Sequence, residues 1–141
     1  MSDVPPHLAQ RFAATELHRL LGLELTEARP GFACIALHTS PATLSGVGGA
    51  VHGGVLAAMV DIAMLFALHA TLEPGDIPNG TAELGITYLR PVHGSRATAE
   101  ASILRKGRSM VYAEISIFDE HRTLCARGRT IYALRRAPEP A

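Results

Sequence analysis

The longest apolar stretch of the chain runs from Val51 to His69 and has the length of a helix. Its apolar residues occupy every side of a helical wheel, which predicts a helix enclosed by the fold rather than laid on its surface. Asp61 lies midway along this stretch and is the only Asp, Glu, Lys or Arg between Pro30 and Leu72. Because a carboxylate is costly to desolvate unless it is paired or hydrogen-bonded, Asp61 is the first candidate for a functional residue.

The segments before this helix predict one more helix and two strands. Residues 1–6 form a loose lead-in, and the apolar positions that follow recur on one side of a surface helix that ends at Gly22. Two strands then meet at a turn signal, Arg29-Pro30-Gly31. The expected bounds are His7–Leu21 for the helix, Leu23–Glu27 and Phe32–Thr39 for the strands, and Ser40–Ala50 for a small-residue loop.

Beyond Glu73-Pro74-Gly75-Asp76 the apolar period changes from helical to two. Alternation with one polar face is typical of an antiparallel sheet that packs on one side. One long apolar helix and about six strands can bury one another only if the sheet curls around the helix, so we expect an α+β class. The edges of such a sheet are free to pair with another subunit. The strands expected here are Thr81–Tyr88, Ala97–Ile103, Val111–Ile117 and Leu124–Leu134.

The length of 141 residues suits a single domain. We expect that domain to span residues 1–141, with 1–21 as lead-in and helix and 22–136 as the core. The formal net charge is zero and 5% of the residues are aromatic, so the composition does not indicate nucleic-acid binding. The N-terminus lacks a signal pattern, and the apolar helix is too short and too interrupted to span a membrane. These features predict a soluble, cytoplasmic protein.

Cysteines and histidines show no metal-ligand spacing. Cys34 and Cys125 lie in apolar, strand-like segments, which favours reduced core residues of an intracellular protein. The seven histidines form no spaced pair of the metal-binding kind. We therefore expect neither a metal nor a separate cofactor. The Gly-x-Ser-x-Gly pattern of the usual serine hydrolases is also missing from the sequence.

Charge is unevenly distributed along the chain. The segment from Arg90 to Arg136 holds ten basic residues and four acidic ones, whereas the first 89 residues hold three basic and eight acidic ones. An anionic ligand would therefore bind most favourably to the C-terminal part. Most of these basic side chains are also compatible with solvated strand edges.

The start of the central helix carries a second chemical feature, the triplet His52-Gly53-Gly54. The first N–H groups of a helix are unpaired and carry partial positive charge, and they could stabilise the oxyanion formed when a carbonyl is attacked. Asp61 follows two turns later and could act as nucleophile or as general base for water. Small residues on its helix face leave room for a thin substrate chain. The pattern is typical of an acyl-transfer site.

The segment from Val51 to Asp61 closely resembles the motif of hotdog-fold acyl-CoA thioesterases, in particular the phenylacetate-degradation and 4-hydroxybenzoyl-CoA thioesterase branch. The resemblance covers roughly Leu17 to Leu134 and includes the strand from Thr81 to Pro91 and the Lys-Gly-Arg-Ser run at 106–109. It implies a curved antiparallel sheet wrapped around one long helix. It also implies hydrolysis of an acyl-CoA by a homo-oligomer, a tetramer built from dimers, with CoA as part of the substrate and with neither nucleic acid nor membrane as partner.

The resemblance assigns roles to individual residues. Asp61 matches the catalytic carboxylate and Gly53 the glycine whose N–H faces the thioester oxygen. His52 shapes that loop, and Thr81 matches the hydroxyl that orients the attacking water. In this family the helix N-terminus and the carboxylate of one site come from different subunits. The residues expected to contact substrate or coenzyme A are Gly54, Arg90, Arg105, Lys106, Gly107, Arg108 and Ser109.

One position departs from the family pattern. Relatives commonly have an Asn six residues before the histidine, where this chain has Gly46. Either Ser45 or a water takes over the missing contact, or the substrate is handled differently. Two alternatives therefore stay open: a protein that binds acyl-CoA without turnover, and, less favoured by the Gly-Gly context, an enoyl-CoA hydratase-like enzyme.

Overall fold

A computed structural model describes residues 3–140; Met1, Ser2 and Ala141 of the predicted domain lie outside the described residues. Within residues 3–140, three α-helices and a short 3-10 turn at Val47–Gly49 accompany six strands. The strands form one antiparallel sheet in the order β1-β2-β4-β5-β6-β3. The bounds are α1 Pro6–Ala14, α2 Glu16–Leu21, β1 Leu23–Arg29, β2 Phe32–His38, α3 Gly53–His69, β3 Asp76–Tyr88, β4 Arg96–Lys106, β5 Met110–Asp119 and β6 Leu124–Arg136.

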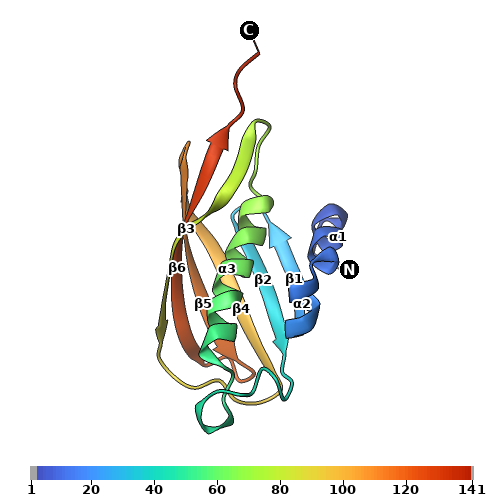
Figure 1. The fold of residues 1–141 in the computed structure, drawn as a ribbon, viewed down its shortest axis with the longest axis vertical. Coiled ribbons are helices and arrows are strands. Elements are labelled where there is room, and N and C mark those ends of the chain that lie inside the picture. Colours follow the sequence, from blue (N-terminus) through green and yellow to red (C-terminus); the bar gives the residue numbers. More distant parts are fainter. Residues whose placement is uncertain (1–2, 141) are drawn as a thin grey trace.

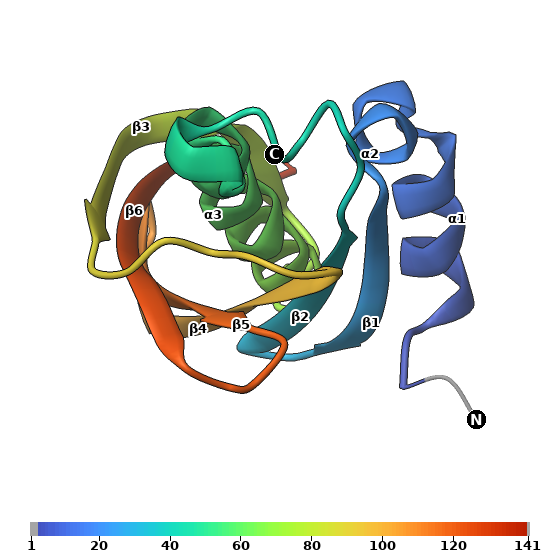
Figure 2. The same cartoon turned by 90° about the horizontal axis from the view of Figure 1, so that it is seen from below.

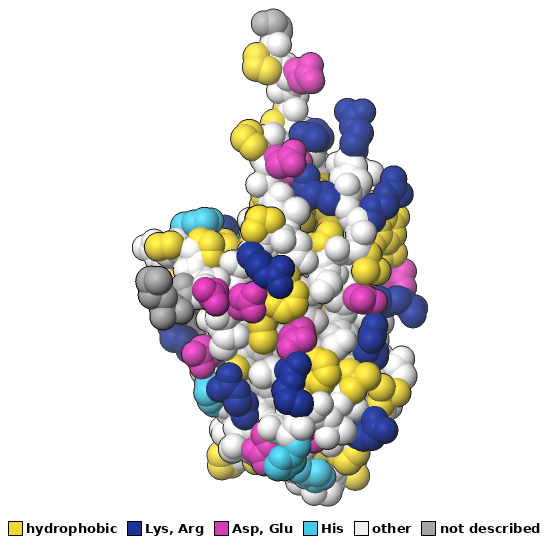
Figure 3. All heavy atoms as spheres, turned by 180° about the vertical axis from the view of Figure 1, so that it is seen from behind, with side chains coloured by type: hydrophobic (Ala, Val, Ile, Leu, Met, Phe, Trp, Pro, Cys, Tyr) yellow, Lys and Arg dark blue, Asp and Glu magenta, His cyan; other side chains and the backbone are white. Residues whose placement is uncertain are grey.

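The sheet curls around α3, as the end-on view of Figure 2 shows, while Figure 1 shows the helix lying along the length of the strands. Alternate residues of β4, β5 and β6 are buried against the helix, and the others face outward. This arrangement confirms the hotdog fold that the sequence predicts. Figure 3 shows the outer face of the sheet, where acidic and basic side chains are interspersed.

Helix α3 and strand β6 approach each other unusually closely at Gly128. A Cβ atom at this glycine would lie 2.6 Å from Cγ1 of Val60, closer than such atoms can pack. Val60 is fully buried. The seating of Val60 against the bare backbone of β6 fixes the rotation of the helix, and the next residue, Asp61, then points about 100° further round.

The N-terminal segment forms two helices, so the prediction of one helix over His7–Leu21 is wrong. Thr15 has an extended backbone (φ −85°, ψ 113°) that separates α1 from α2. The break lets both helices pack their aromatic residues inward: the Phe12 ring lies 5.0 Å from that of Phe66 on α3, and Nδ1 of His18 lies 3.0 Å from the carbonyl oxygen of Phe12.

One stripe of α3 is left uncovered, contrary to the expectation that the fold encloses the whole helix. Gly54 is exposed, and Ala57, Ala58, Asp61 and Leu65 are only half-buried, at the i, i+3/i+4 spacing of a single helix face. The neighbouring strand β3 is an edge strand, paired with β6 on one side only. Within the described part of one chain, nothing covers the apolar residues of this stripe.

Both cysteines are free, Cys34 half-buried and Cys125 buried, and burial raises the pKa of each thiol. Among the helices of residues 3–140, none is long and apolar enough to cross a membrane.

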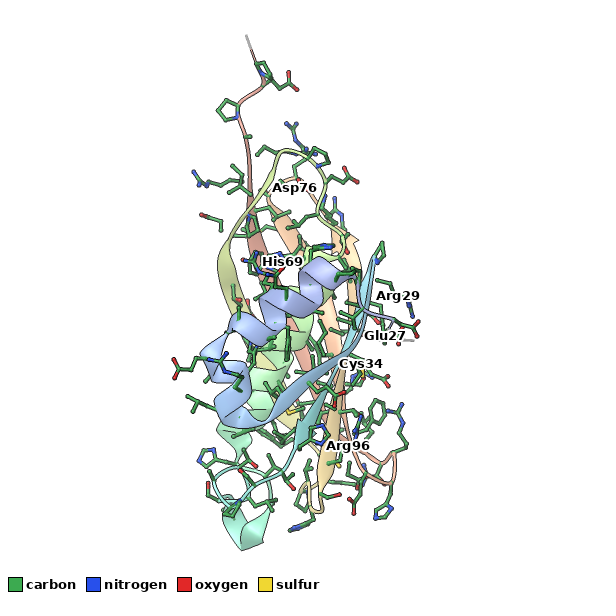
Figure 4. All side chains as sticks on the ribbon, turned by 90° about the vertical axis from the view of Figure 1, so that its right-hand side faces the viewer. Glu27, Arg29, Cys34, His69, Asp76 and Arg96 are labelled. Atoms are coloured by element: carbon green, nitrogen blue, oxygen red, sulfur yellow. The ribbon has the colours of Figure 1, made fainter. Side chains whose placement is uncertain are left out.

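An ion-pair cluster around Asp76 ties the start of β3 to the ends of β4 and β6. The Asp76 side chain is 1% exposed; its Oδ2 lies 2.7 Å from Nζ of Lys106 and accepts a hydrogen bond from the Glu73 N–H, and Arg136 lies 3.7 Å from Oδ1. The hydrogen bond from Lys106, followed by that from Glu73, lowers the pKa of Asp76 below its usual value. Figure 4 shows Asp76 at the turn that leads into β3.

The substitution Asp76→Asn should lower the free energy of unfolding by about 2 kcal/mol, because it leaves the largely buried Lys106 ammonium without its partner. Because folding lowers the pKa of Asp76, its carboxylate stabilises the fold fully at any pH above the pKa that Asp76 has in the unfolded chain. That stabilisation is lost as the pH falls from there through the lower, folded-state pKa. Urea unfolding at pH 7 measures the change. The matched control is Glu83→Gln, which breaks the exposed pair with Arg129 and should change stability by less than about 0.5 kcal/mol. Equal effects of the two substitutions would contradict this assignment.

His69 at the end of α3 is a second group with a shifted pKa. Its ring lies 6.0 Å from that of Phe66, and Figure 4 shows it beside α1. Burial, with a smaller contribution from the charge of Arg11, lowers its pKa from 6.5 to about 4. The fold therefore holds His69 neutral.

A depressed histidine pKa stabilises the fold above the unfolded value of 6.5, and that stability is lost as pH falls from 6.5 towards 4. We expect His69 to account for about 2 kcal/mol of this loss, allowing for its incomplete burial. The measurement compares unfolding free energies at pH 7 and pH 4.5 for the native chain and for His69→Leu. A pH dependence that is identical in the two proteins would show that His69 titrates normally in the folded chain.

Candidate active site

Asp61 and Thr81, which the sequence analysis placed in one site, are in direct contact. The Thr81 hydroxyl on β3 donates a hydrogen bond to Oδ1 of Asp61 on α3 at 2.7 Å. Thr81 is exposed and Asp61 is half-buried, so within one chain the pair is open to solvent. Among residues 3–140, no other group is bonded to the Asp61 carboxylate, which leaves one oxygen free to accept from a water.

A β-bulge aims Thr81 at the helix. Strict alternation would place Thr81 with Glu83 on the outer face of the sheet, but the register with β6 shifts between these two residues. Thr81 pairs with Tyr132 and Leu84 with Thr130, and both of these β6 partners are buried on the inner face. The extra residue of the bulge thus turns Thr81 to the side that faces Asp61.

Tyr132 is a further polar group near this pair, and the sequence analysis did not single it out. Its side chain is 6% exposed, and burial raises the pKa of its phenol, with the nearby charge of Asp61 adding to the rise. Only the pairing of β3 with β6 reveals this neighbour.

His52 caps the helix that Gly53 and Gly54 begin. Its backbone N–H donates to Thr43, and its Nδ1 accepts a hydrogen bond from the Gly54 N–H at 2.9 Å. The Gly54 N–H is thereby used inside the chain. No acceptor for the Gly53 N–H occurs within the described part of the chain, so this group remains available to a ligand at the positive end of the helix.

Tyr88, at the end of β3, packs directly on Gly53. Its hydroxyl donates a hydrogen bond to the Gly53 carbonyl oxygen at 2.7 Å, and a Cβ at Gly53 would lie 3.2 Å from the tyrosine oxygen. Glycine at 53 therefore permits close approach of the phenol. The alternating pattern predicts Tyr88 as a sheet residue but gives no sign of this contact.

Gly53 and Asp61 of one chain do not converge on a common point. Eight residues separate them on α3, which is about 12 Å along the helix axis and about 80° around it. A carboxylate that attacks a thioester, or holds the attacking water, while an N–H binds the thioester oxygen requires the two groups about 6 Å apart. One chain by itself therefore presents the two functional groups in separate places.

The loop before the helix has no room for a side chain at position 46. A Cβ at Gly46 would lie 2.7 Å from the carbonyl oxygen of Ala50, and the Gly46 N–H already donates to that oxygen at 2.8 Å. The Ser45 hydroxyl donates to the Ala42 carbonyl oxygen at 2.7 Å and so does not take the place of the asparagine that the family resemblance leads us to expect at position 46. Val47 instead is 97% exposed at the tip of the loop. Of the alternatives raised by Gly46, a role for the Ser45 side chain is therefore disfavoured.

The residues expected to contact coenzyme A fall at two ends of the molecule. Arg90 lines a hollow of about 400 Å³ together with Gly53 and Tyr88, next to the start of α3. Arg105, Gly107, Arg108 and Ser109 lie at the turn between β4 and β5, and the two arginines are exposed. Figure 3 shows basic side chains gathered where β6 leads into the C-terminal tail, at that same end.

Lys106 differs from its neighbours in this turn. Its ammonium is bound to Asp76 and is 17% exposed, so it would have to leave that ion pair to reach a phosphate. The exposed arginines at 105 and 108 have no such constraint within residues 3–140. No cluster of three or more His, Cys, Asp or Glu suited to a metal ion occurs among those residues either.

Comparison with known proteins agrees with this geometry. The family model described as the thioesterase superfamily matches residues 48–126, which include the helix, Asp61 and Thr81. A medium/long-chain acyl-CoA thioesterase, YigI of Salmonella typhimurium, is 30% identical over 128 residues, covering 82% of this chain and 83% of that protein.

Two solved structures share the fold. A thioesterase from Haemophilus influenzae has a TM-score of 0.83 at 23% identity and covers 96% of this chain and 93% of its own. The Escherichia coli PaaI protein of the phenylacetic acid degradation operon has a TM-score of 0.77 at 22% identity, covering 94% and 95%. The family match and the YigI relationship together show that this chain belongs to the thioesterase superfamily.

Proposed function

We propose that this protein hydrolyses an acyl-CoA thioester to the free acid and coenzyme A. The observation that carries the proposal is the hydrogen bond between Thr81 and Asp61 on a helix whose first N–H is available at its start. In the proposed reaction the Gly53 N–H binds the thioester oxygen. Asp61 either takes a proton from the attacking water or attacks the carbonyl carbon itself. The C–S bond then breaks, and the thiolate of coenzyme A takes up a proton. When water attacks, this step releases the free acid directly; when Asp61 attacks, it leaves an acyl–Asp61 anhydride, which a water molecule then hydrolyses to the free acid and the regenerated carboxylate.

Thr81 supports either version of this step. Its hydroxyl proton is committed to Asp61, which holds the carboxylate in place, and its oxygen can still accept a hydrogen bond from the attacking water. The reaction needs only these side chains, a backbone N–H and water, so the proposal includes no cofactor beyond the coenzyme A of the substrate.

We propose that each site is shared by two chains. The separation of Gly53 from Asp61 along α3 requires the oxyanion donor to come from a second copy whose helix runs antiparallel to the first. The uncovered stripe of α3 and the free edge of β3 are the surfaces available for this pairing. Assembly of two such dimers into a tetramer, and a cytoplasmic location, stay predictions.

The substrate would approach along charged and apolar surfaces already described. Arg90 lies beside the helix start, while Arg105 and Arg108 lie towards the opposite end of α3, beyond Asp61. Arginine at these positions suits the phosphates of coenzyme A. Gly107 and Ser109 add backbone groups at the same turn, whereas Lys106 would first have to leave Asp76.

For the acyl group we favour a medium or long aliphatic chain. The small and apolar residues Ala57, Ala58 and Leu65 line the uncovered stripe on which it would lie. The relationship to YigI, whose name specifies medium/long-chain acyl-CoA, points the same way. The phenylacetate-degradation or 4-hydroxybenzoyl branch stays an alternative, because the likeness to PaaI at 22% identity concerns the fold alone.

The substitution Asp61→Asn should lower kcat by about a thousandfold, because the amide keeps the size of the carboxylate but can neither attack nor accept a proton. The measurement is thiol release from octanoyl-, lauroyl- and palmitoyl-CoA beside phenylacetyl- and benzoyl-CoA. Glu83→Gln on the outer face of β3 serves as the control and should leave the rate unchanged.

Three other results would each revise the proposal. Binding of all five thioesters without thiol release would establish the non-catalytic alternative, for which the missing amide at Gly46 is the motivation. Addition of water to an enoyl-CoA in place of hydrolysis would establish the hydratase alternative. Faster hydrolysis of the aromatic substrates would reverse the preference for aliphatic chains.

A site shared by two chains predicts complementation between defective subunits. Gly53→Pro removes the N–H and adds a Cβ that approaches Tyr88, and the helix can accept it because proline is tolerated at the first helical position and His52 already has the extended backbone that precedes proline. Mixed dimers of this variant with Asp61→Asn contain one intact site. Random mixing makes half of the dimers mixed, and each mixed dimer has one of its two sites intact. The mixture should therefore recover about a quarter of the native rate.

The control for this experiment is Gly53→Ala, which adds the same Cβ against Tyr88 but keeps the N–H, and which should retain more activity than Gly53→Pro. Each defective variant is also assayed alone after the same unfolding and remixing. If the mixture is no more active than its components, then both groups act within one chain.

A further inference from the structure

Strand β3 contacts α3 at both candidate functional positions, its start and its middle. Thr81 near its middle binds Asp61, and Tyr88 at its end binds Gly53. The first of these contacts belongs to the reaction proposed above. The second contact involves a residue with no role in that reaction, although it lies on the peptide unit next to the proposed oxyanion donor.

We infer that Tyr88 is a positioning residue that holds the Gly53 N–H in the orientation needed to bind the thioester oxygen. This inference rests on the proposed function. The Tyr88 ring is 51% exposed in the single chain, and the polar contact of its side chain within residues 3–140 is the 2.7 Å hydrogen bond to the Gly53 carbonyl oxygen. This hydrogen bond, rather than burial in its own chain, is the contact through which Tyr88 acts on the helix start.

The residues just before α3 are tied to the rest of the fold by backbone hydrogen bonds, from the Val51 N–H to Val92 and from the His52 N–H to Thr43. Within the first turn itself, His52 binds the Gly54 N–H through its own ring, a local contact between residues two apart. Tyr88 is 35 residues from Gly53 in sequence and connects the first helical residue to β3. Without its hydroxyl, Gly53 would lose this tether, and the backbone of a glycine yields more easily than that of other residues.

The hydrogen bond acts on the Gly53 N–H through orientation rather than through charge. The carbonyl that Tyr88 binds shares its peptide unit with the Gly54 N–H, which is used by His52, whereas the Gly53 N–H lies on the preceding peptide unit. An oriented oxyanion donor acts on the stabilisation of the transition state rather than on the binding of the coenzyme A portion. The inference therefore predicts a change in kcat with little change in KM.

The test is Tyr88→Phe, which keeps the ring and removes the hydroxyl, with Tyr112→Phe on the outer face of β5 as the matched control. We expect kcat to fall about tenfold with KM within about twofold, since a displaced oxyanion donor loses part of its effect on the transition state. Tyr112→Phe should match the native chain. Combining Tyr88→Phe with Gly53→Ala should cost less than the product of the two single effects, because both disturb the same contact.

A merely structural role would give a different result. In that case Tyr88→Phe would lower the melting temperature while kcat stays within about twofold of native, and the inference would be overturned. A rise in KM with unchanged kcat would overturn it as well, because it would place Tyr88 in substrate binding.

Backbone NMR relaxation separates this inference from the proposed function. If Tyr88 fixes the helix start, the order parameter of the Gly53 N–H falls in Tyr88→Phe relative to the native chain and to Tyr112→Phe. That comparison needs no substrate, so it remains decisive even if the native protein releases no thiol. Equal order parameters at Gly53 in all three proteins would refute the positioning role.

Discussion

The contact between Val60 and Gly128 is the constraint on which the rest of the site depends. A helix can rotate and slide over a sheet unless something fixes it, and here a β-branched side chain presses on backbone that has no Cβ to separate them. This close approach sets the rotation of α3 and brings β6 near the helix. Since β3 pairs with β6, the same contact places Thr81 within reach of Asp61.

Much of the fold was predictable because the hydrophobic pattern is strong. A long apolar helix followed by period-two segments admits few arrangements, and the six strands and their antiparallel pairing agree with that expectation. The break at Thr15 was not predictable, because the apolar positions on either side still fit one helix. What separates the two helices is tertiary: Phe12 and His18 must both turn toward Phe66.

The site was predictable in its residues and less so in its environment. The isolation of Asp61 in the sequence correctly marked it as unusual, but the inference that the fold encloses it was wrong, because one curled sheet cannot surround a helix completely. Thr81 was identified by resemblance alone, since alternation places it on the wrong face until the bulge is seen. Tyr88 carries no signal in a single sequence, because its partner is a backbone oxygen 35 residues away.

Position 46 illustrates how a backbone turn can restrict the side chain that a position accepts. An amide side chain there would require Ala50 and its neighbours to move, because the space that a Cβ needs is occupied by a carbonyl oxygen. A substitution to asparagine at this position would therefore give a strained loop rather than a new polar contact. The glycine and its turn form one structural unit, so a side chain can be introduced at position 46 only if the backbone from Gly46 to Ala50 is rebuilt with it.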